Sequence, residues 1–388
     1  MLPLEPMIRL FQGPCRFISL APTSVLVIML VVVSSAGQGS RPTGTGASPA
    51  LRQAISDAAK KYKIPGIAAA LIEHGQLGAI EVFGVRDQKS NAPITANTIF
   101  EAGSLGEPMF AYAVLRFASE GRFNLGEPLT TYLPLPYVRD LDAISVSRAT
   151  EPIYDPRFNQ ITAIRVMNHT SGLPDWARNQ HLSMQSLPGV KWSYSNEAYL
   201  YLQHVVEHVT GEPFEDFLNR NLLGPFGMSH SSFVWRDEFA AALATGYDRS
   251  GLPVDPHRYT RPAAATTLYT SLRDYAQFVQ GLLASAPSQH VHESAVSQML
   301  GPTVAVQDSA SFSWGLGVAL EKTDDNVFFL HRENNPGFQS FVIASRKTGS
   351  GLVIFTNSGN GLQAVPDIVA ATLGGNHPIL KSNFLQSQ

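Results

Sequence analysis

Ser104 has a setting that could make it a nucleophile. It stands in the segment Phe100–Pro108, at the head of a helix that the apolar pattern predicts from Ser104 to about Gly121. The amino end of a helix favours negative charge that develops beside it. A serine becomes a nucleophile only when a base lies within hydrogen-bond reach. Taken alone, the segment is also open to a plainer interpretation, because serine is a common N-cap.

Later segments could supply the groups that such a serine needs. One reads Tyr-Ser-Asn from Tyr194 to Asn196 and directly precedes a predicted helix. Another reads His-Arg-Glu-Asn-Asn-Pro-Gly-Phe and begins at His331. Two more short motifs are His-Thr-Ser-Gly-Leu from His169 and Pro-Phe-Gly-Met from Pro225. Each motif is too short to identify a function by itself.

Together, the order of these motifs resembles that of the serine β-lactamase-related hydrolases. This family includes class C β-lactamases, D-alanyl-D-alanine carboxypeptidases and esterases of the same fold. The resemblance extends from about Leu51 to Leu373 and rests on five motifs in register. It implies an α/β (α+β) fold of the β-lactamase/transpeptidase type, in which an antiparallel sheet is flanked by terminal helices and an all-helical lobe is inserted. It also implies a serine hydrolase that acts through an acyl-enzyme on an ester, a D-amino-acid peptide or a β-lactam.

The resemblance implies a role for each residue that matches a motif. Ser104 corresponds to the acylated nucleophile of the S-x-x-K motif, and Tyr194 to the tyrosine that moves protons to and from it. Asn196 corresponds to the asparagine that hydrogen-bonds the substrate amide. His331 stands where the family has lysine or histidine in its third motif. The oxyanion hole, which binds the negative oxygen of the intermediate, would be the backbone N–H groups of Ser104 and Asn334.

The lysine of the S-x-x-K motif is absent, because position 107 is Glu107 and no lysine of the chain has a serine three residues before it. In the family, that lysine helps to remove the serine proton and holds positive charge near the oxyanion. At about 4 Å and an effective dielectric near 20, the attraction of a lysine for the oxyanion, or the repulsion by a glutamate, amounts to about 4 kcal/mol at most. We also expect Glu107 to raise the pKa of Tyr194, which makes the tyrosine a poorer base. The alternative is that Glu107 itself acts as the base toward Ser104.

Glu333 is a second departure, because the family has glycine at this position of the third motif. Glycine lets a substrate lie close against the strand. A glutamate would narrow the cleft, add negative charge to it, or point away and distort the edge. Two positions of the expected site therefore carry acids, whereas Ser104, Tyr194, Asn196 and His331 are retained.

Three further features could be mistaken for parts of a site. The sequence Lys-Thr-Gly at 347–349 lies between two predicted strands, so we interpret it as a turn. His204 and His208 form an H-x-x-E-H pattern that can bind zinc on a helix, but no motif marks a third ligand. Strand alternation predicts that Arg332 faces away from its two neighbours. We therefore expect neither a metal nor another cofactor.

Periodicity and turn signals predict the elements that position these residues. Helices are expected over 51–62, 104–121, 197–210, 213–222 and 362–373, and strands over 67–72, 79–83, 314–320, 327–331, 338–345 and 352–356. Strands at both ends of the chain predict one antiparallel sheet that both termini close. The middle of the chain, roughly 122–300, would form the inserted helical lobe.

The N-terminal segment has the order of a secretory signal. Arg9 and Arg16 precede a short apolar run, Val25–Val33, and small residues follow it. The run is shorter than the roughly 20 residues of a transmembrane helix. We expect 1–36 to be a signal peptide or N-terminal anchor, 37–50 a flexible linker and 51–388 the β-lactamase-like domain. The protein would then be exported, periplasmic or extracellular, and any membrane attachment would use this segment alone.

Composition limits the possible functions. The 388 residues are 44% hydrophobic and 15% charged, with a formal net charge of −3. These values are typical of a globular protein and exclude the clustered Lys and Arg of a nucleic-acid-binding surface. The single Cys15 excludes a disulfide framework. We expect a small-molecule or peptide substrate and leave two functions open: a hydrolase, or a catalytically impaired relative that binds a ligand or protein partner through the former cleft.

Overall fold

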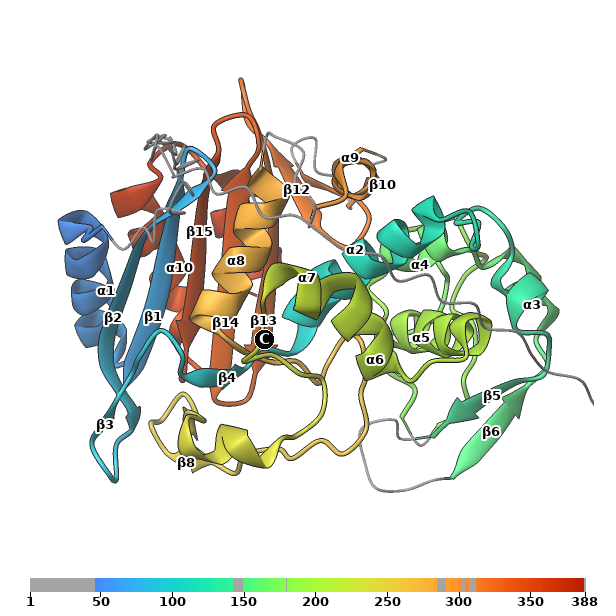
Figure 1. Ribbon diagram of the computed structural model, residues 1–388, viewed down its shortest axis with the longest axis horizontal. Coiled ribbons are helices and arrows are strands. Elements are labelled where there is room, and N and C mark those ends of the chain that lie inside the picture. The colour runs from blue at the N-terminus through green and yellow to red at the C-terminus, as the bar shows by residue number, and fades with distance from the viewer. Residues whose placement is uncertain are drawn as a thin grey trace, which may run out of the picture. The chain divides into compact units, whose positions relative to one another are not determined.

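A nine-stranded antiparallel sheet is built from both ends of the chain (Figure 1). The computed structural model describes residues 46–141, 149–178, 180–284, 291–301, 304–306 and 312–386, and the expected signal segment lies outside them. The strand order is β10-β11-β12-β13-β14-β15-β1-β2-β3, so the N-terminal β1 pairs directly with the C-terminal β15. Within the described ranges, we find no helix that is both long and apolar enough to cross a membrane.

The strands of this sheet are joined mainly by hairpins. In chain order they are β1 (Gly66–Glu73), β2 (Gln76–Asp87), β3 (Ala92–Pro93), β10 (Val304–Ala305), β11 (Phe312–Trp314), β12 (Ala319–Lys322), β13 (Val327–Asn335), β14 (Phe338–Ser345) and β15 (Ser350–Thr356). The predicted hairpin of β1 and β2 has His74 and Gly75 at positive φ in its turn. β14 is buried along its whole length, because helices cover both faces of the sheet.

The two faces of β1 contact different helices. Ile67 and its alternate neighbours pack with α1 (Pro49–Tyr62) and α10 (Gly361–Thr372), whereas Ala68 and its alternate neighbours pack with α8 (Leu272–Leu283). α1 begins after the N-cap Ser48, so it includes the last two residues of the expected linker. A short C-terminal helix, α11 (Asn383–Gln386), follows α10.

The inserted lobe packs around α2 (Gly106–Ser119), which is almost entirely buried. The other elements of this region are α3 (Leu129–Tyr132), α4 (Ala163–Met167), α5 (Asn196–Thr210), α6 (Phe214–Leu218), α7 (Gly224–Phe226), and the strand pairs β5 (Tyr137–Asp140) with β6 (Thr150–Ile153) and β7 (Gly246–Tyr247) with β8 (Pro253–Val254). β4 (Ile99–Glu101) pairs with β9 (Tyr269–Ser271), and α9 (Glu293–Leu300) packs on α2.

Three boundaries differ from those expected from the sequence. The expected strand 314–320 is two strands, β11 and β12, because a tight turn at 315–318 contains Gly317 with a φ of +84°. The expected helix 213–222 is α6 followed by a π-helical turn at Asn219–Leu223. α8 packs on the sheet, so the lobe ends well before residue 300, and its short strands show that it is not all helical.

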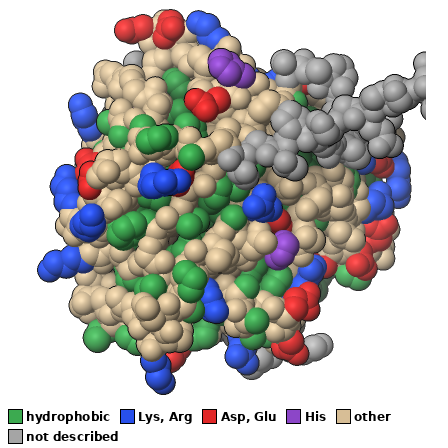
Figure 2. Space-filling model, turned by 60° about the vertical axis from the view of Figure 1, so that its left-hand side comes forward, with side chains coloured by type: hydrophobic (Ala, Val, Ile, Leu, Met, Phe, Trp, Pro, Cys, Tyr) green, Lys and Arg blue, Asp and Glu red, His purple; other side chains and the backbone are tan. Residues whose placement is uncertain are grey.

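Charged side chains are interspersed on the surface. Figure 2 shows one face of the molecule, and over its described part acidic and basic side chains are mixed rather than gathered by sign. The chain has 28 basic and 31 acidic residues. This part of the surface therefore lacks the continuous positive charge that a nucleic-acid backbone requires.

Candidate active site

Ser104 lies in a 3₁₀ turn, Gly103–Leu105, between β4 and α2. The turn places the serine at the amino end of α2, where the sequence predicts it. Its hydroxyl donates a hydrogen bond to the carbonyl oxygen of Ala265, 3.1 Å away in the loop before β9. Gly103 has a φ of +39°, and a side chain there would collide with the carboxylate of Glu333. The loop before β9 and strand β13 thus enclose the serine.

Three segments bring the predicted site residues into one cluster. Ser104 and Glu107 come from the start of α2, Tyr194 and Asn196 from the start of α5, and His331, Glu333 and Asn334 from β13. His331 and Glu333 lie on the face of β13 that meets Ser104 and α2, because alternate residues of a strand share a face. Arg332 lies on the other face, with its guanidinium 5.2 Å from the ring centre of Phe384.

Glu107 is fully buried one helical turn below Ser104, between two histidines. Its Oε2 lies 3.2 Å from Nε2 of His331 and 3.3 Å from Nε2 of His169. Burial favours the protonated acid, but the charges and hydrogen bonds of the two histidines outweigh burial and lower the pKa of Glu107. His169 belongs to the His-Thr-Ser-Gly-Leu motif, to which the sequence analysis gave no role in the site.

The other hydrogen bonds of the two histidines locate their protons. Nδ1 of His169 accepts the backbone N–H of Ser195 at 3.2 Å, so its proton is on Nε2 and faces Glu107. Nδ1 of His331 lies 3.0 Å from the carbonyl oxygen of Arg332, which can only accept, so this nitrogen carries a proton. One more proton lies between Nε2 of His331 and Glu107. Whichever of the two holds it, the pair has no net charge.

Aromatic rings hold His169 in place. Its ring centre lies 4.3 Å from that of Tyr194, 4.9 Å from that of Trp314 and 6.0 Å from that of Trp192. The residue is fully buried and has a φ of +57°, which is uncommon outside glycine. The surrounding structure therefore fixes this imidazole beside Glu107 despite the backbone conformation.

Tyr194 is protonated in this setting and is therefore unavailable as a base. Burial raises its pKa well above the ordinary value, and the charge of Glu107 raises it further, whereas a hydrogen bond with Ser104 lowers it less. This is the direction expected from the sequence. At neutral pH the phenol therefore keeps its proton and cannot readily accept the proton of Ser104.

Asn196 is the first residue of α5 and is nearly buried. Its side-chain nitrogen donates a hydrogen bond to Oδ1 of Asp175 at 2.5 Å. Its side-chain oxygen has no hydrogen-bond partner within the described part of the chain. Asp175, whose pKa is raised by burial, is a site residue that no sequence motif indicates. The amide oxygen of Asn196 is thus available to a donor group of a ligand.

Glu333 fills the position at which the oxyanion hole was expected. Its Oε2 accepts the backbone N–H of Ser104, and its Oε1 accepts that of Asn334 at 2.8 Å. The side chain is 5% exposed, and burial raises the pKa of Glu333 to about 7. Of the possibilities raised by the sequence, the glutamate therefore enters the cleft and adds a carboxylate to it.

A cavity of about 340 Å³ is lined by residues that are next in sequence to site residues, among them Glu197, Thr266 and Asn335. It is lined by Asp140, Trp176, Glu197, His257, Tyr259 and Asn335, among others. Asn335 directly follows Asn334 in β13, so the cavity lies near the oxyanion-hole region. The carboxylate of Glu101 hydrogen-bonds His257 at 2.8 Å and raises the pKa of this histidine. The cavity has the size of a small-molecule site, with aromatic and charged walls.

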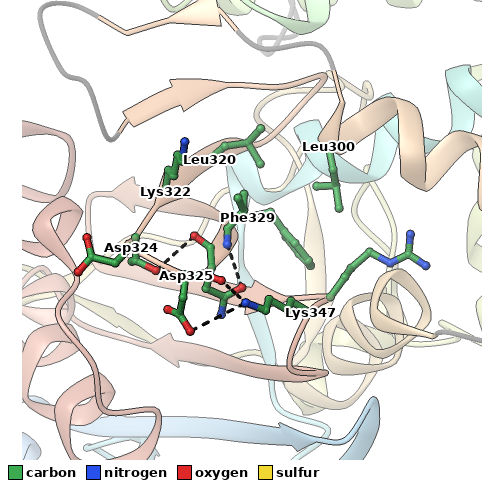
Figure 3. A pocket seen from close by; sticks show the side chains of 11 residues that line it. Leu300, Leu320, Lys322, Asp324, Asp325, Phe329 and Lys347 are labelled. Carbon is green, nitrogen blue, oxygen red and sulfur yellow. Dashed lines mark hydrogen bonds and ion pairs between the residues drawn. The ribbon is translucent and has the colours of Figure 1, made fainter.

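The Lys-Thr-Gly sequence at 347–349 lies near the start of β13, whereas the site residues His331, Glu333 and Asn334 lie toward its end. Lys347 lies in the turn between β14 and β15 and lines a different pocket, near the start of β13 (Figure 3). Its Nζ donates to the carbonyl oxygen of Asp325 and lies 3.9 Å from the carboxylate of the same residue. Figure 3 shows this group at the hairpin end of the sheet. The interpretation of 347–349 as a turn is confirmed.

The H-x-x-E-H pattern serves packing in this structure. Nδ1 of His204 lies 3.0 Å from the hydroxyl of Tyr137, and its Nε2 lies 3.9 Å from Asp140. Burial lowers the pKa of His204. Among the residues that the structure describes, no group of three or more His, Cys, Asp or Glu side chains is arranged to hold a metal ion.

Comparison with known proteins decides the family. Residues 51–373, most of the chain, match the family described as Beta-lactamase. The chain belongs to the β-lactamase family. This result confirms the resemblance found in the sequence, and membership supports a function of the serine-hydrolase type in general terms.

Two relatives show how far the similarity extends. A β-lactamase of Pseudomonas fluorescens is 25% identical over 234 residues, which are 57% of this chain and 60% of that protein. The putative penicillin-binding protein PbpX of Bacillus subtilis (strain 168) is 24% identical over 328 residues, 79% of this chain and 74% of that protein. The match to this chain therefore spans less than two thirds of the Pseudomonas protein.

Solved structures confirm the fold. The D-alanine carboxypeptidase AmpC of Burkholderia cenocepacia is similar with a TM-score of 0.68 and 18% identity, over 83% of this chain and 98% of that one. An octameric penicillin-binding protein homologue of Pyrococcus abyssi is similar with a TM-score of 0.70 and 20% identity, over 87% and 79%. At this level of identity the comparison establishes the β-lactamase/transpeptidase-like α/β fold.

Proposed function

We propose that this chain is a catalytically impaired member of the β-lactamase family, which binds a small molecule or peptide through the cleft at Ser104. The observation that carries the proposal is the state of Glu107. This carboxylate takes the place of the motif's lysine and lies between His169 and His331. Glu107 and His331 together have no net charge, and Nε2 of His169 also faces the carboxylate.

The consequence for acylation follows from charge. An oxyanion that forms at Ser104 needs positive charge or N–H donors beside it. The lysine of the motif would supply a full positive charge about 4 Å away, an effect of about 4 kcal/mol at most. In this chain the neutral pair of Glu107 and His331 supplies none. A loss of that size lowers a rate by as much as about three powers of ten.

The tyrosine and histidine of the motifs are not free to accept the proton of Ser104. Tyr194 is protonated at neutral pH because its pKa is raised. His331 directs one nitrogen to Glu107 and the other to a backbone carbonyl. Ser104 donates to the carbonyl of Ala265 and also has a hydrogen bond with the Glu333 carboxylate, which two backbone N–H groups already hold. These contacts support binding rather than turnover.

The ligand would occupy the 340 Å³ cavity and the cleft beside it. Trp176 and Tyr259 offer aromatic surface, and the free side-chain oxygen of Asn196 offers a hydrogen-bond acceptor. A ligand with a ring and an N–H donor would use both. This combination suits a small molecule or the end of a peptide.

A second candidate is an active serine hydrolase that acts through an acyl-enzyme on an ester, a D-amino-acid peptide or a β-lactam. The observation that favours it is the hydrogen bond between Ser104 and Tyr194, which keeps nucleophile and tyrosine together. Similarity to a β-lactamase and to a putative penicillin-binding protein also favours it. In this case Glu107 would have to replace the lysine as base.

Intact-mass measurement after exposure to a fluorophosphonate and, in parallel, to a penicillin separates the two candidates. We expect no adduct on the wild type at neutral pH and an adduct on Glu107→Lys, whose lysine restores the positive charge. Ser104→Ala in the Glu107→Lys background is the control and should remain unmodified. An adduct on the wild type that is lost in Ser104→Ala would overturn impairment. No adduct on either chain would show that Glu107 alone is not the cause of the impairment.

A further inference from the structure

The carboxylate of Glu333 behaves as a ligand of the cleft that the chain itself supplies. Its two oxygens each accept one backbone N–H, from Ser104 and from Asn334. The two N–H groups come from two elements, the 3₁₀ turn before α2 and strand β13, and both point at this one carboxylate. A free carboxylate would bind such a pair of donors in the same way.

The position of Glu333 is enforced by its surroundings. Gly103 has no side chain, and any Cβ there would collide with the Glu333 carboxylate. The residue is 5% exposed, so its carboxylate lies in the interior rather than in solvent. The absence of a side chain at 103 therefore makes room for the carboxylate that replaces the family's glycine at 333.

The charges that face Glu333 leave it poorly compensated. Arg332 acts on it from the same strand but points to the other face of the sheet. The charge of Glu333 raises the pKa of Tyr194, in the loop before α5, and of Tyr259, in the loop before β9. Both side chains are neutral phenols at neutral pH. Glu107, from α2, forms a pair with His331, and this pair has no net positive charge to offer Glu333. The two N–H donors are thus the main stabilisation of the carboxylate.

We propose that Glu333 is an internal ligand of the oxyanion hole, which excludes carboxylates and other oxyanions from Ser104 as long as Glu333 is ionised and in place. The proposal deepens the proposed function, and rests on it in taking the cleft as a binding site. Protonation of Glu333 removes one acceptor, because the O–H oxygen then meets an N–H donor. Acid therefore weakens this internal contact, and the burial that raises its pKa to about 7 brings the change near neutrality.

Benzoate is a suitable probe, because it combines a carboxylate with a ring and stays ionised at pH 5.5. We would titrate it by calorimetry into the wild type, Glu333→Gly and Glu333→Gln at pH 8 and pH 5.5. At pH 8 we expect Glu333→Gly to bind benzoate about tenfold more tightly than the wild type, because two charge-assisted hydrogen bonds become available. From pH 8 to pH 5.5 we expect the affinity of the wild type to rise about fivefold or more, and that of Glu333→Gly to stay constant.

Two controls assign the effect to the N–H pair. Ser104→Ala removes the hydroxyl but keeps the backbone N–H, so Glu333→Gly with Ser104→Ala should keep the tighter binding. Glu81→Gln removes the same amount of charge on β2, where Arg52 is the partner, and should bind benzoate as the wild type does. If Glu333→Gly does not fold, the pH dependence of the wild type and the affinity of Glu333→Gln carry the test.

Equal benzoate affinity of the wild type at pH 8 and pH 5.5, together with no gain in Glu333→Gly or Glu333→Gln, would overturn the internal ligand. That result would leave impairment by Glu107 intact, since the adduct experiment tests it separately. An adduct on wild-type Ser104 would instead overturn the proposed function. The two failures are therefore distinguishable.

Discussion

Glu107 and Glu333 are buried carboxylates in contact with the same small site, but their partners favour opposite protonation states. His169 and His331 lower the pKa of Glu107 despite burial. Two backbone N–H groups do not outweigh burial at Glu333, so its pKa is raised to about 7. Net charge near Ser104 is therefore zero or negative at neutral pH. An acyl-enzyme pathway requires positive charge or free N–H donors beside the serine.

The raised pKa of Glu333 predicts a measurable pH dependence of stability. Its ordinary value is 4.5, so the fold disfavours the ionised form. Glu333 makes its full contribution to the free energy of unfolding below pH 4.5, and this contribution is lost as the pH rises through about 7. The free energy of unfolding of Glu333→Gln relative to the wild type should therefore increase by about 3 kcal/mol between pH 4.5 and pH 8. Urea unfolding at both pH values measures this difference.

Glu81 is the matched control for this prediction. Its pKa is lowered: burial opposes the shift, but the hydrogen bond with Arg52 and further contacts outweigh it. Glu81→Gln should thus lose more stability at pH 8 than at pH 4.5, the opposite sign. A difference between Glu333→Gln and the wild type that does not change with pH would contradict the burial of an ionisable Glu333.

At the scale of elements, β13 and α2 position the site by simple periodicity. Strand alternation predicts correctly that His331 and Glu333 share a face and that Arg332 lies on the other. The helical rise places Glu107 one turn below Ser104. The turn between β11 and β12 could not be predicted in the same way, because residues 314–320 are apolar enough for one strand. What interrupts it is a tertiary contact of Gly317 with Ala111 of α2.

Gly317 therefore predicts a stability effect that its sequence context does not indicate. It has a φ of +84°, and a Cβ there would collide with Ala111. Gly121 has a similar φ of +77° but open space around it. Gly121→Ala should cost about 1 kcal/mol from backbone strain, and Gly317→Ala about 2 kcal/mol more from overpacking. Urea unfolding of both variants tests this, and equal losses would show that the close contact with α2 has no energetic weight.

At the scale of the whole molecule, the site exists only when distant parts of the chain meet. Ser104, Tyr194 and His331 are separated by about 90 and 137 positions, and β13 belongs to the sheet in which β1 pairs with β15. Strands at both ends of the chain predict the closure of the sheet by both termini, and the motifs predict the site residues from three segments. His169 lies in a motif, but its contact with Glu107, like the contacts of Asp175 and Ala265, depends on packing of the lobe and could not be assigned from the sequence. The orientation of Glu333 likewise depends on the empty space at Gly103.

The claim that Glu107 and Glu333 impair the site is tested most directly by the rate at which a fluorophosphonate modifies Ser104. We would measure this rate in four chains: wild type, Glu107→Lys, Glu333→Gly and the double variant. Glu107→Lys restores the charge, and Glu333→Gly opens the oxyanion hole. We expect each single change to raise the rate, and the double variant to react at least about a hundred times faster than the wild type. Ser104→Ala in the double variant should abolish the reaction. A wild-type Ser104 that reacts as fast as the double variant would contradict the claim that these two carboxylates disarm the site.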